Sequence, residues 1–92
     1  MALLSEDVIQ VELASMDRWT YSNNEIYKDI SFQSYMAGIG FVNQLAEIAE
    51  AKNHHPGLTV GWCNVGVTFT SHDQGGMTSE CIAMAKTVNV IL

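Results

Sequence analysis

Apolar residues recur along the chain with two spacings, one typical of helices and one typical of strands. Over residues 5–16, Val8 and Val11 recur at helical spacing, and Leu4 lies one turn earlier. We therefore predict a first helix here, with these three residues as one apolar stripe. Ser5 is a suitable N-cap, because its hydroxyl can accept a hydrogen bond from a free backbone N–H of the first turn.

The longest helical pattern runs from Phe32 to about Ala51, with Ser31 as its predicted N-cap. One apolar face at helical spacing consists of Phe32, Tyr35, Met36, Ile39, Val42, Ala46 and Ala49, and a second stripe of Phe41, Leu45 and Ile48. A helix that is apolar on more than one side must be covered on more than one side. We expect one side to face a sheet and the other a second subunit; a single wide core face is the alternative.

Two stretches alternate between apolar and polar residues, as half-buried strands do. Residues 19–30 are predicted to form a hairpin, in which the triplet "SNN" supplies the turn. Residues 58–70 are predicted to form two more strands, since Val65, Val67 and Phe69 alternate with Gly66 and with threonines. The turn between these strands is expected near Asn64, and one bent strand is the alternative.

A last helix is predicted from its N-cap Thr78 to Val90, with an apolar stripe of Ile82, Ala85 and Val88. The resulting order is α-β-β-α-β-β-α. Short connections within each strand pair favour antiparallel pairing. We therefore predict one α+β domain over residues 1–92, in which a four-stranded antiparallel sheet carries three helices on one face.

Composition and charge exclude several classes of protein. The net charge is −6, and the basic residues are few and scattered, namely Arg18, Lys28, Lys52 and Lys86. Direct binding to nucleic acid is therefore not expected, because it requires a basic face. No apolar run approaches the roughly 20 residues that span a membrane, and the start "MALLSED" does not have the pattern of a secretion signal. We expect a cytoplasmic protein in which Cys63 and Cys81 are free thiols.

The three histidines are His54, His55 and His72, and the first two precede the only proline, Pro56. Pro56 favours an extended conformation at His55, so the long helix should end near His54. If the last two strands are antiparallel neighbours, His72 returns to the end of the sheet where the histidine pair lies. The three imidazoles would then line one cleft, with Glu50 one helical turn before His54.

Such a cluster has three interpretations. Imidazole gives and takes a proton near neutral pH, so several in one pocket suit a reaction with separate acid and base steps. Three histidines would also suffice for zinc, but adjacent histidines are poorly spaced as ligands and no acid-rich surrounding is evident, so we expect no metal. The third interpretation is that the histidines only cap elements or lie on the surface.

The spacing of these residues resembles the signature of the pterin-4a-carbinolamine dehydratases, also called 4a-hydroxytetrahydrobiopterin dehydratases. That signature is an acidic or polar residue, three residues, His-His-Pro, a short gap, an aromatic residue, nine residues and a histidine. The matching residues here are Glu50, His54, His55, Pro56, Trp62 and His72. Upstream, residues 19–50 resemble the aromatic hairpin and long helix of the family. The resemblance covers residues 5–92.

The resemblance implies the dehydration of a 4a-hydroxytetrahydropterin to a quinonoid dihydropterin, in tetrahydrobiopterin recycling. It implies that His54 is the leading acid/base residue and that His72 assists at the other proton. His55 and Glu50 would bind and polarise the pterin, and Pro56 and Trp62 would complete the substrate-binding site. No metal or organic cofactor is implied, because the pterin is the substrate.

The family commonly forms dimers or tetramers through its long helix, here residues 32–51, and through a sheet edge. Some members serve as dimerisation cofactors for a homeodomain transcription factor. One position departs from the family pattern: an aspartate is expected nine residues after the third histidine, and Cys81 stands there. This departure supports the alternative that the protein is a weakly active or non-catalytic interaction module on the same fold.

Overall fold

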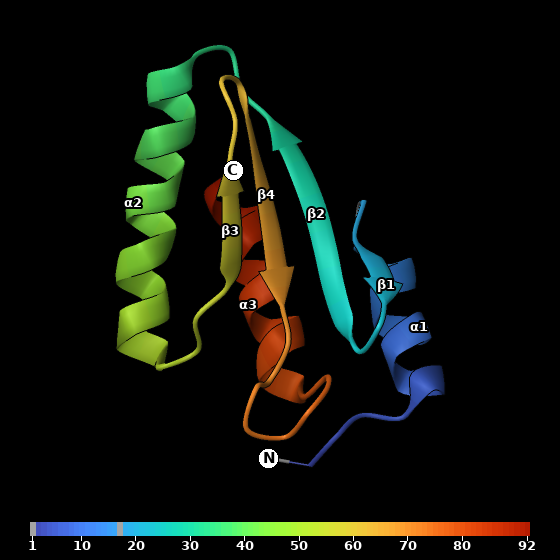
Figure 1. The fold of residues 1–92 in the computed structure, drawn as a ribbon. Coiled ribbons are helices and arrows are strands. Elements are labelled where there is room, and N and C mark those ends of the chain that lie inside the picture. Colours follow the sequence, from blue (N-terminus) through green and yellow to red (C-terminus); the bar gives the residue numbers. More distant parts are fainter. Residues whose placement is uncertain (1, 17) are drawn as a thin grey trace.

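The computed structural model describes residues 2–16 and 18–92, and within them the chain forms three helices and four strands. The order along the chain is the predicted α-β-β-α-β-β-α (Figure 1). The elements are α1 Glu6–Ala14, β1 Thr20–Ser22, β2 Glu25–Ser31, α2 Tyr35–Lys52, β3 Gly57–Val60, β4 Asn64–Phe69 and α3 Ser79–Ile91. No helix among the described residues is long and apolar enough to cross a membrane.

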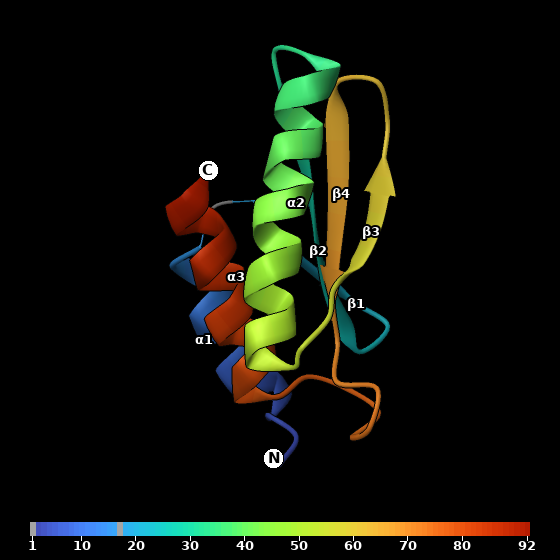
Figure 2. The same cartoon turned by 90° about the vertical axis from the view of Figure 1, so that its left-hand side faces the viewer.

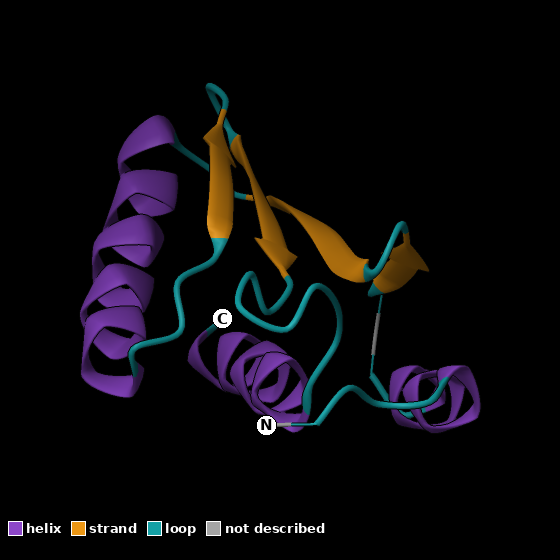
Figure 3. Ribbon diagram, turned by 60° about the horizontal axis from the view of Figure 1, so that its bottom comes forward, coloured by secondary structure: helices purple, strands orange, loops and turns teal. Residues whose placement is uncertain are grey.

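The strands form one sheet in the order β1-β2-β4-β3, and each neighbouring pair is antiparallel. The helices all lie on one side of this sheet (Figures 2 and 3). The predicted α+β class is therefore confirmed. Antiparallel pairing of β3 with β4 also places the start of β3 and the end of β4 at the same end of the sheet, with Gly57 opposite Thr68.

The core lies between the sheet and the helices. Alternate residues of β2 are buried, and β4 buries Val65, Val67 and Phe69 completely, because only one face of the sheet is covered by helices. From the helical side, α2 contributes Phe41, Leu45 and Ala49, and α3 contributes Cys81, Ile82, Met84, Ala85 and Val88. The apolar stripe predicted for the last helix is thus confirmed.

The start of the long helix differs from the prediction. Ser34, not Ser31, is the N-cap of α2, and its side chain accepts a hydrogen bond from the backbone N–H of Ala37 at 3.0 Å. Ser31 remains in β2 because the sheet continues past it. The backbone N–H of Phe32 donates to the carbonyl of Cys63 at 2.8 Å, which keeps the chain extended for another residue.

The two apolar stripes of α2 have different surroundings. Phe41 and Leu45 of the second stripe face the sheet and are buried. The first stripe is divided: Ala49 is buried and Phe32 and Val42 pack against the core, whereas Tyr35 is 48% and Met36 69% exposed. Phe41 is buried and Ile48 packs against the core, as the interpretation of a wide core face expects.

Of the apolar stripe predicted for the first helix, only Leu4 packs against the core. Val8 and Val11 are exposed, and Ile9 is the residue of α1 that is buried in the core. The chain enters α1 through a hydrogen bond from the backbone N–H of Leu4 to the carbonyl of Met77, at 2.8 Å. This tie to the segment before α3 sets which side of α1 faces inward, and the short sequence pattern does not contain that information.

Both turns within the sheet are resolved. Asn23 and Asn24 have φ values of 52° and 63°, as a two-residue hairpin turn requires, so the predicted turn is confirmed. Residues 58–70 form two strands and not one bent strand. Their turn comprises residues 61–63, slightly before the predicted position, and Asn64 already begins β4. Cys63 in this turn and Cys81 in α3 are free thiols.

Candidate active site

The end of α2 determines where the adjacent histidines point. Asn53 adopts the left-handed conformation, with φ 51° and ψ 42°, and ends the helix. The backbone N–H of His54 then donates to the carbonyl of Ala49 at 3.1 Å, so the chain turns sharply back. As a result, the side chain of His54 is 10% exposed whereas that of its neighbour His55 is 52% exposed.

Both ring nitrogens of His54 lie close to a side-chain partner. Nδ1 lies 3.5 Å from Oε2 of Glu80, and Nε2 lies 3.4 Å from Sγ of Cys81. The ring also stacks on Phe69, with 6.0 Å between ring centroids and 18° between the planes. A buried imidazole requires partners for its polar atoms, and α3 supplies both of them from two consecutive residues of its first turn.

The thiol of Cys81 belongs to a small hydroxyl cluster. Its sulfur lies 3.4 Å from Oγ of Ser71, and that oxygen lies 2.7 Å from Oγ1 of Thr78. Thr78 occupies the predicted N-cap position of α3 but makes no side-chain cap bond, because its hydroxyl is turned toward Ser71. Both Thr78 and Cys81 are fully buried, so they lie behind the ring of His54 in the protein interior.

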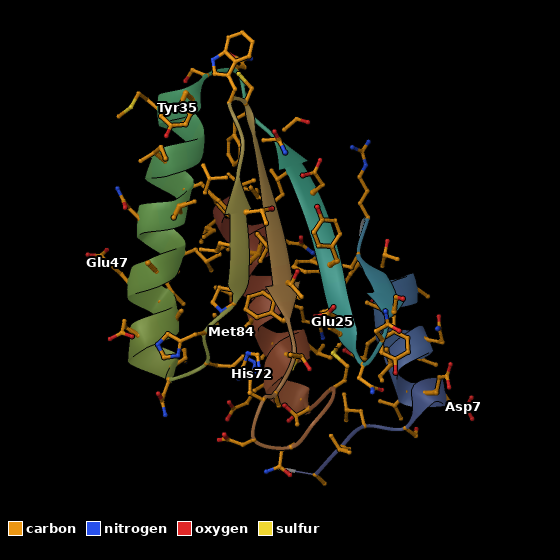
Figure 4. The ribbon with its side chains drawn as sticks, in the orientation of Figure 1. Asp7, Glu25, Tyr35, Glu47, His72 and Met84 are labelled. Carbon is orange, nitrogen blue, oxygen red and sulfur yellow. The ribbon has the colours of Figure 1, made fainter. Side chains whose placement is uncertain are left out.

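His55 and His72 are the more accessible histidines. Nε2 of His55 lies 2.5 Å from Oε1 of Glu50, which is itself 78% exposed. His72 lies in the exposed turn after β4, at the end of the sheet where β3 begins (Figure 4). The backbone N–H of Ser71 donates to the carbonyl of Gly76 at 2.9 Å and closes this turn.

The structure brings the three histidines together. They line one pocket of about 460 Å³, with Lys52, Ser71 and Glu80 among the other lining residues. A smaller pocket of about 280 Å³ lies beside it and shares Lys52, His54 and Glu80. The main pocket falls within the usual size range of small-molecule sites, about 300–1,000 Å³. Its acidic and basic side chains give it groups that can both donate and accept protons.

The other expected site residues lie at different distances from this pocket. Glu50 contacts His55 but is not among the lining residues, and neither is the half-buried Pro56. Trp62 is 81% exposed in the turn at the opposite end of β3 and β4. The six residues of β4 separate the two ends by about 20 Å. A ligand between the histidines therefore does not reach Trp62 of the same chain, which corrects its expected place in the site.

Glu80 was missed by the sequence analysis, and so was the contact between Cys81 and His54. The chain offered only one hint, which is that position 81 falls where the family signature has a carboxylate. Contacts across 26 or 27 residues depend on how α3 packs at the end of the sheet. Among the described residues, no group of three or more His, Cys, Asp and Glu side chains is arranged to hold a metal ion.

The fold and this pocket define a class of small α+β protein with a histidine-lined site at one end of an antiparallel sheet. The family model described as Pterin 4 alpha carbinolamine dehydratase matches residues 2–91. The chain therefore belongs to the pterin 4 alpha carbinolamine dehydratase family, and the resemblance seen in its sequence is confirmed.

Similar proteins agree with this assignment. The chain is 34% identical, over 97% of its own length and 95% of the relative's, to a protein of Mycobacteroides abscessus named as a candidate pterin-4-alpha-carbinolamine dehydratase. A protein of the same name from Natronomonas pharaonis is 39% identical over 90% of this chain and 88% of its own.

Two solved structures have related folds. A transcriptional coactivator/pterin dehydratase from Brucella melitensis superposes with a TM-score of 0.93, at 30% identity and 97% coverage of both chains. A pterin dehydratase-like protein, described as a RuBisCO assembly factor in the alpha-carboxysome, has a TM-score of 0.66 at 23% identity. It covers 80% of this chain and 86% of its own, and at that identity it supports the fold alone.

Proposed function

We propose that the protein removes water from a 4a-hydroxytetrahydropterin and releases the quinonoid dihydropterin, as a hydro-lyase in tetrahydrobiopterin recycling. The observation that carries the proposal is the meeting of His54, His55 and His72 in one pocket of about 460 Å³. A pterin is a flat, polar, two-ring molecule, and a pocket of this size with donors and acceptors on its walls suits it. Membership of the family supports the same reaction.

The chemistry needs one acid and one base. The C4a–O bond breaks, and the leaving hydroxide takes a proton and departs as water. The proton on N5 goes to a base, and the electron pair of the N–H bond forms the N5=C4a double bond. We assign the acid/base roles to His54 and His72, since imidazole can serve in either role near neutral pH. The reaction requires no metal and no organic cofactor.

The binding role falls to the outer part of the site. His55 lines the pocket and is paired with Glu50, so this pair can hold the polar edge of the pterin. Pro56 follows directly and fixes the backbone through which His55 is presented. Because the net charge is −6, direct binding to nucleic acid is not part of this proposal. The proposed site of action is the cytoplasm.

The test is the rate of water loss from freshly generated 4a-hydroxytetrahydropterin, with and without the purified protein. We expect acceleration by the wild type and a loss of at least about 100-fold in His54→Ala. His54→Ala must retain its circular dichroism spectrum for the comparison to count. A folded wild-type protein that leaves the uncatalysed rate unchanged would sink the enzymatic proposal.

A second function is supported by one observation. The first apolar stripe of α2, with Tyr35 and Met36 exposed, offers a surface for a partner. We propose that it mediates a homodimer or homotetramer together with an edge of the sheet, where β3 is the short outer strand. The same face would bind the partner if the protein acts as an interaction module. The Brucella relative is named as a transcriptional coactivator/pterin dehydratase, which supports this second possibility.

A further inference from the structure

The ring of His54 can exchange a proton with the pocket on one side only. Nε2 lies 3.4 Å from Sγ of Cys81, and that residue is completely buried. Behind the sulfur are the hydroxyls of Ser71 and Thr78, so protein groups occupy this side of the ring. In the protonated imidazole both nitrogens carry a proton, and sulfur is a weak acceptor, so Sγ of Cys81 can hold the Nε2 proton while Nδ1 carries the exchangeable one.

On the pocket side, Nδ1 faces a carboxylate. Oε2 of Glu80 lies 3.5 Å away, and the Glu80 side chain is 44% exposed. Both residues line the main pocket and the smaller one beside it. The separation slightly exceeds a normal hydrogen bond, so a small movement of the flexible glutamate closes it, as is common in sites without their ligand.

We propose that Glu80 is a catalytic residue of this site and that it carries the proton between His54 and the bound molecule. The proposal rests on the dehydration proposed above. Protonated His54 would pass its Nδ1 proton to the carboxylate of Glu80, and Glu80 would give that proton to the hydroxyl leaving from C4a. His54 is then left neutral, with its remaining proton on Nε2. The His54–Glu80 pair, having lost one proton, regains it from solvent through the open pocket, while His72 holds the proton taken from N5.

The alternative is that Glu80 only stabilises the start of α3. Glu80 is the second residue of α3, and a negative charge there is stabilised by the helix dipole wherever its carboxylate points. Glu6 has the matching role at the start of α1, where it is exposed and far along the chain from the histidines. Glu6→Gln is therefore the matched control for the loss of one charge in a first helical turn.

The experiment compares Glu80→Gln, Glu80→Asp and Glu6→Gln with the wild type in two measurements. In the dehydration assay, we expect kcat of Glu80→Gln to fall by about 100-fold while KM changes by less than about threefold. Glu80→Asp, which keeps the acid, should recover part of the rate. In ¹⁵N NMR spectra without substrate, the Nδ1 resonance of His54 should move in Glu80→Gln and remain in place in Glu6→Gln.

The two measurements distinguish failure of the dehydration proposal from failure of the proposal for Glu80. An active wild type whose kcat survives Glu80→Gln within about twofold would overturn the catalytic role. If the wild type itself is inactive, the dehydration proposal fails, and the NMR spectra still decide whether Glu80 and His54 share a proton. An unmoved Nδ1 resonance in folded Glu80→Gln overturns the inference in that case as well.

Discussion

Nε2 of His55 lies 2.5 Å from Oε1 of Glu50, across the end of α2. Its neighbour His54 points the opposite way and meets Glu80. The left-handed residue Asn53 creates this division, because it reverses the chain just before the pair. Two adjacent histidines thus have two separate carboxylate partners, one at the rim of the pocket and one on its wall.

The pair of His55 and Glu50 at the rim of the pocket leads to a prediction about substrate binding. Glu50 contacts His55 but does not line the pocket, so it acts by holding that ring in place. Exposed ion pairs are worth up to about 1 kcal/mol, which corresponds to a change of about fivefold in affinity. We expect Glu50→Gln to raise KM for the 4a-hydroxytetrahydropterin by up to that factor and to leave kcat nearly unchanged, as measured by steady-state kinetics.

Glu47 provides the control for this prediction. It lies one turn earlier on α2, is exposed, and points away from the sheet (Figure 4). Glu47→Gln removes the same charge from the same helix, and we expect no change in KM. Equal effects of the two substitutions would show that long-range charge, and not the contact with His55, is responsible.

The thiol against His54 leads to a prediction about stability. Cys81→Ala removes the partner of Nε2 and leaves a buried nitrogen without a hydrogen bond. Such a loss costs about 1–3 kcal/mol. We expect urea denaturation to give a free energy of unfolding lower by that amount. Cys63→Ala, at a half-buried position in the distant turn, should change it by less than about 0.5 kcal/mol, and equal losses would contradict the role of the thiol.

Periodicity was sufficient to predict the elements, their order and the sheet, because each buries one face and its apolar residues recur accordingly. Periodicity did not predict at which residue each element begins or which side of α1 faces the core. Ser31 and Ser34 are equally good N-caps in isolation, and the choice between them depends on a hydrogen bond from Phe32 to Cys63, far along the chain. The same holds for α1, where a tie between Leu4 and Met77 decides that Ile9 and not Val8 faces inward.

The meeting of the three histidines follows from antiparallel pairing of two strands, and the sequence pattern contains that pairing. The partners of His54 do not follow from it. The stripe of α3 predicts which side faces the sheet, but not how far along the sheet the helix begins, and that distance brings Glu80 and Cys81 to the ring. Trp62 matches the family spacing, yet the length of β4 carries it to the other end.

A third prediction concerns a partly buried polar link that joins α3 to Lys28 of β2 and to Trp19 just before β1. Oδ1 of Asn89 accepts hydrogen bonds from Nε1 of Trp19 at 3.1 Å and from Nζ of Lys28 at 3.0 Å. Lys28 is only 8% exposed, and its ammonium lies 6.0 Å from the centre of the Trp19 ring. Asn89→Ala removes the acceptor from both donors, and we expect a loss of about 2–3 kcal/mol in the free energy of unfolding.

Lys28→Met tests the same link from the other side. This change removes the buried charge together with its need for a partner, so it should cost less than Asn89→Ala. Trp19 also retains its acceptor in this variant. Urea denaturation of the two variants gives the comparison, and a larger loss in Lys28→Met would mean that the ammonium stabilises the fold by more than its bond to Asn89.

The last prediction concerns the open face of α2. Tyr35 and Met36 are exposed in the single chain, and Tyr35 lies at the end of α2 away from His72 (Figure 4). If this face binds a second copy, two lysines there bring like charges together in an apolar contact. We expect sedimentation velocity to give a dimer or tetramer for the wild type and a monomer for Tyr35→Lys/Met36→Lys. The circular dichroism spectrum should remain unchanged, because neither side chain is part of the core.

Gln44→Lys is the control, since nine residues after Tyr35 the helix presents the opposite side. A wild-type protein that sediments as a monomer, or a double variant that keeps its oligomeric mass, would rule out this face as the interface.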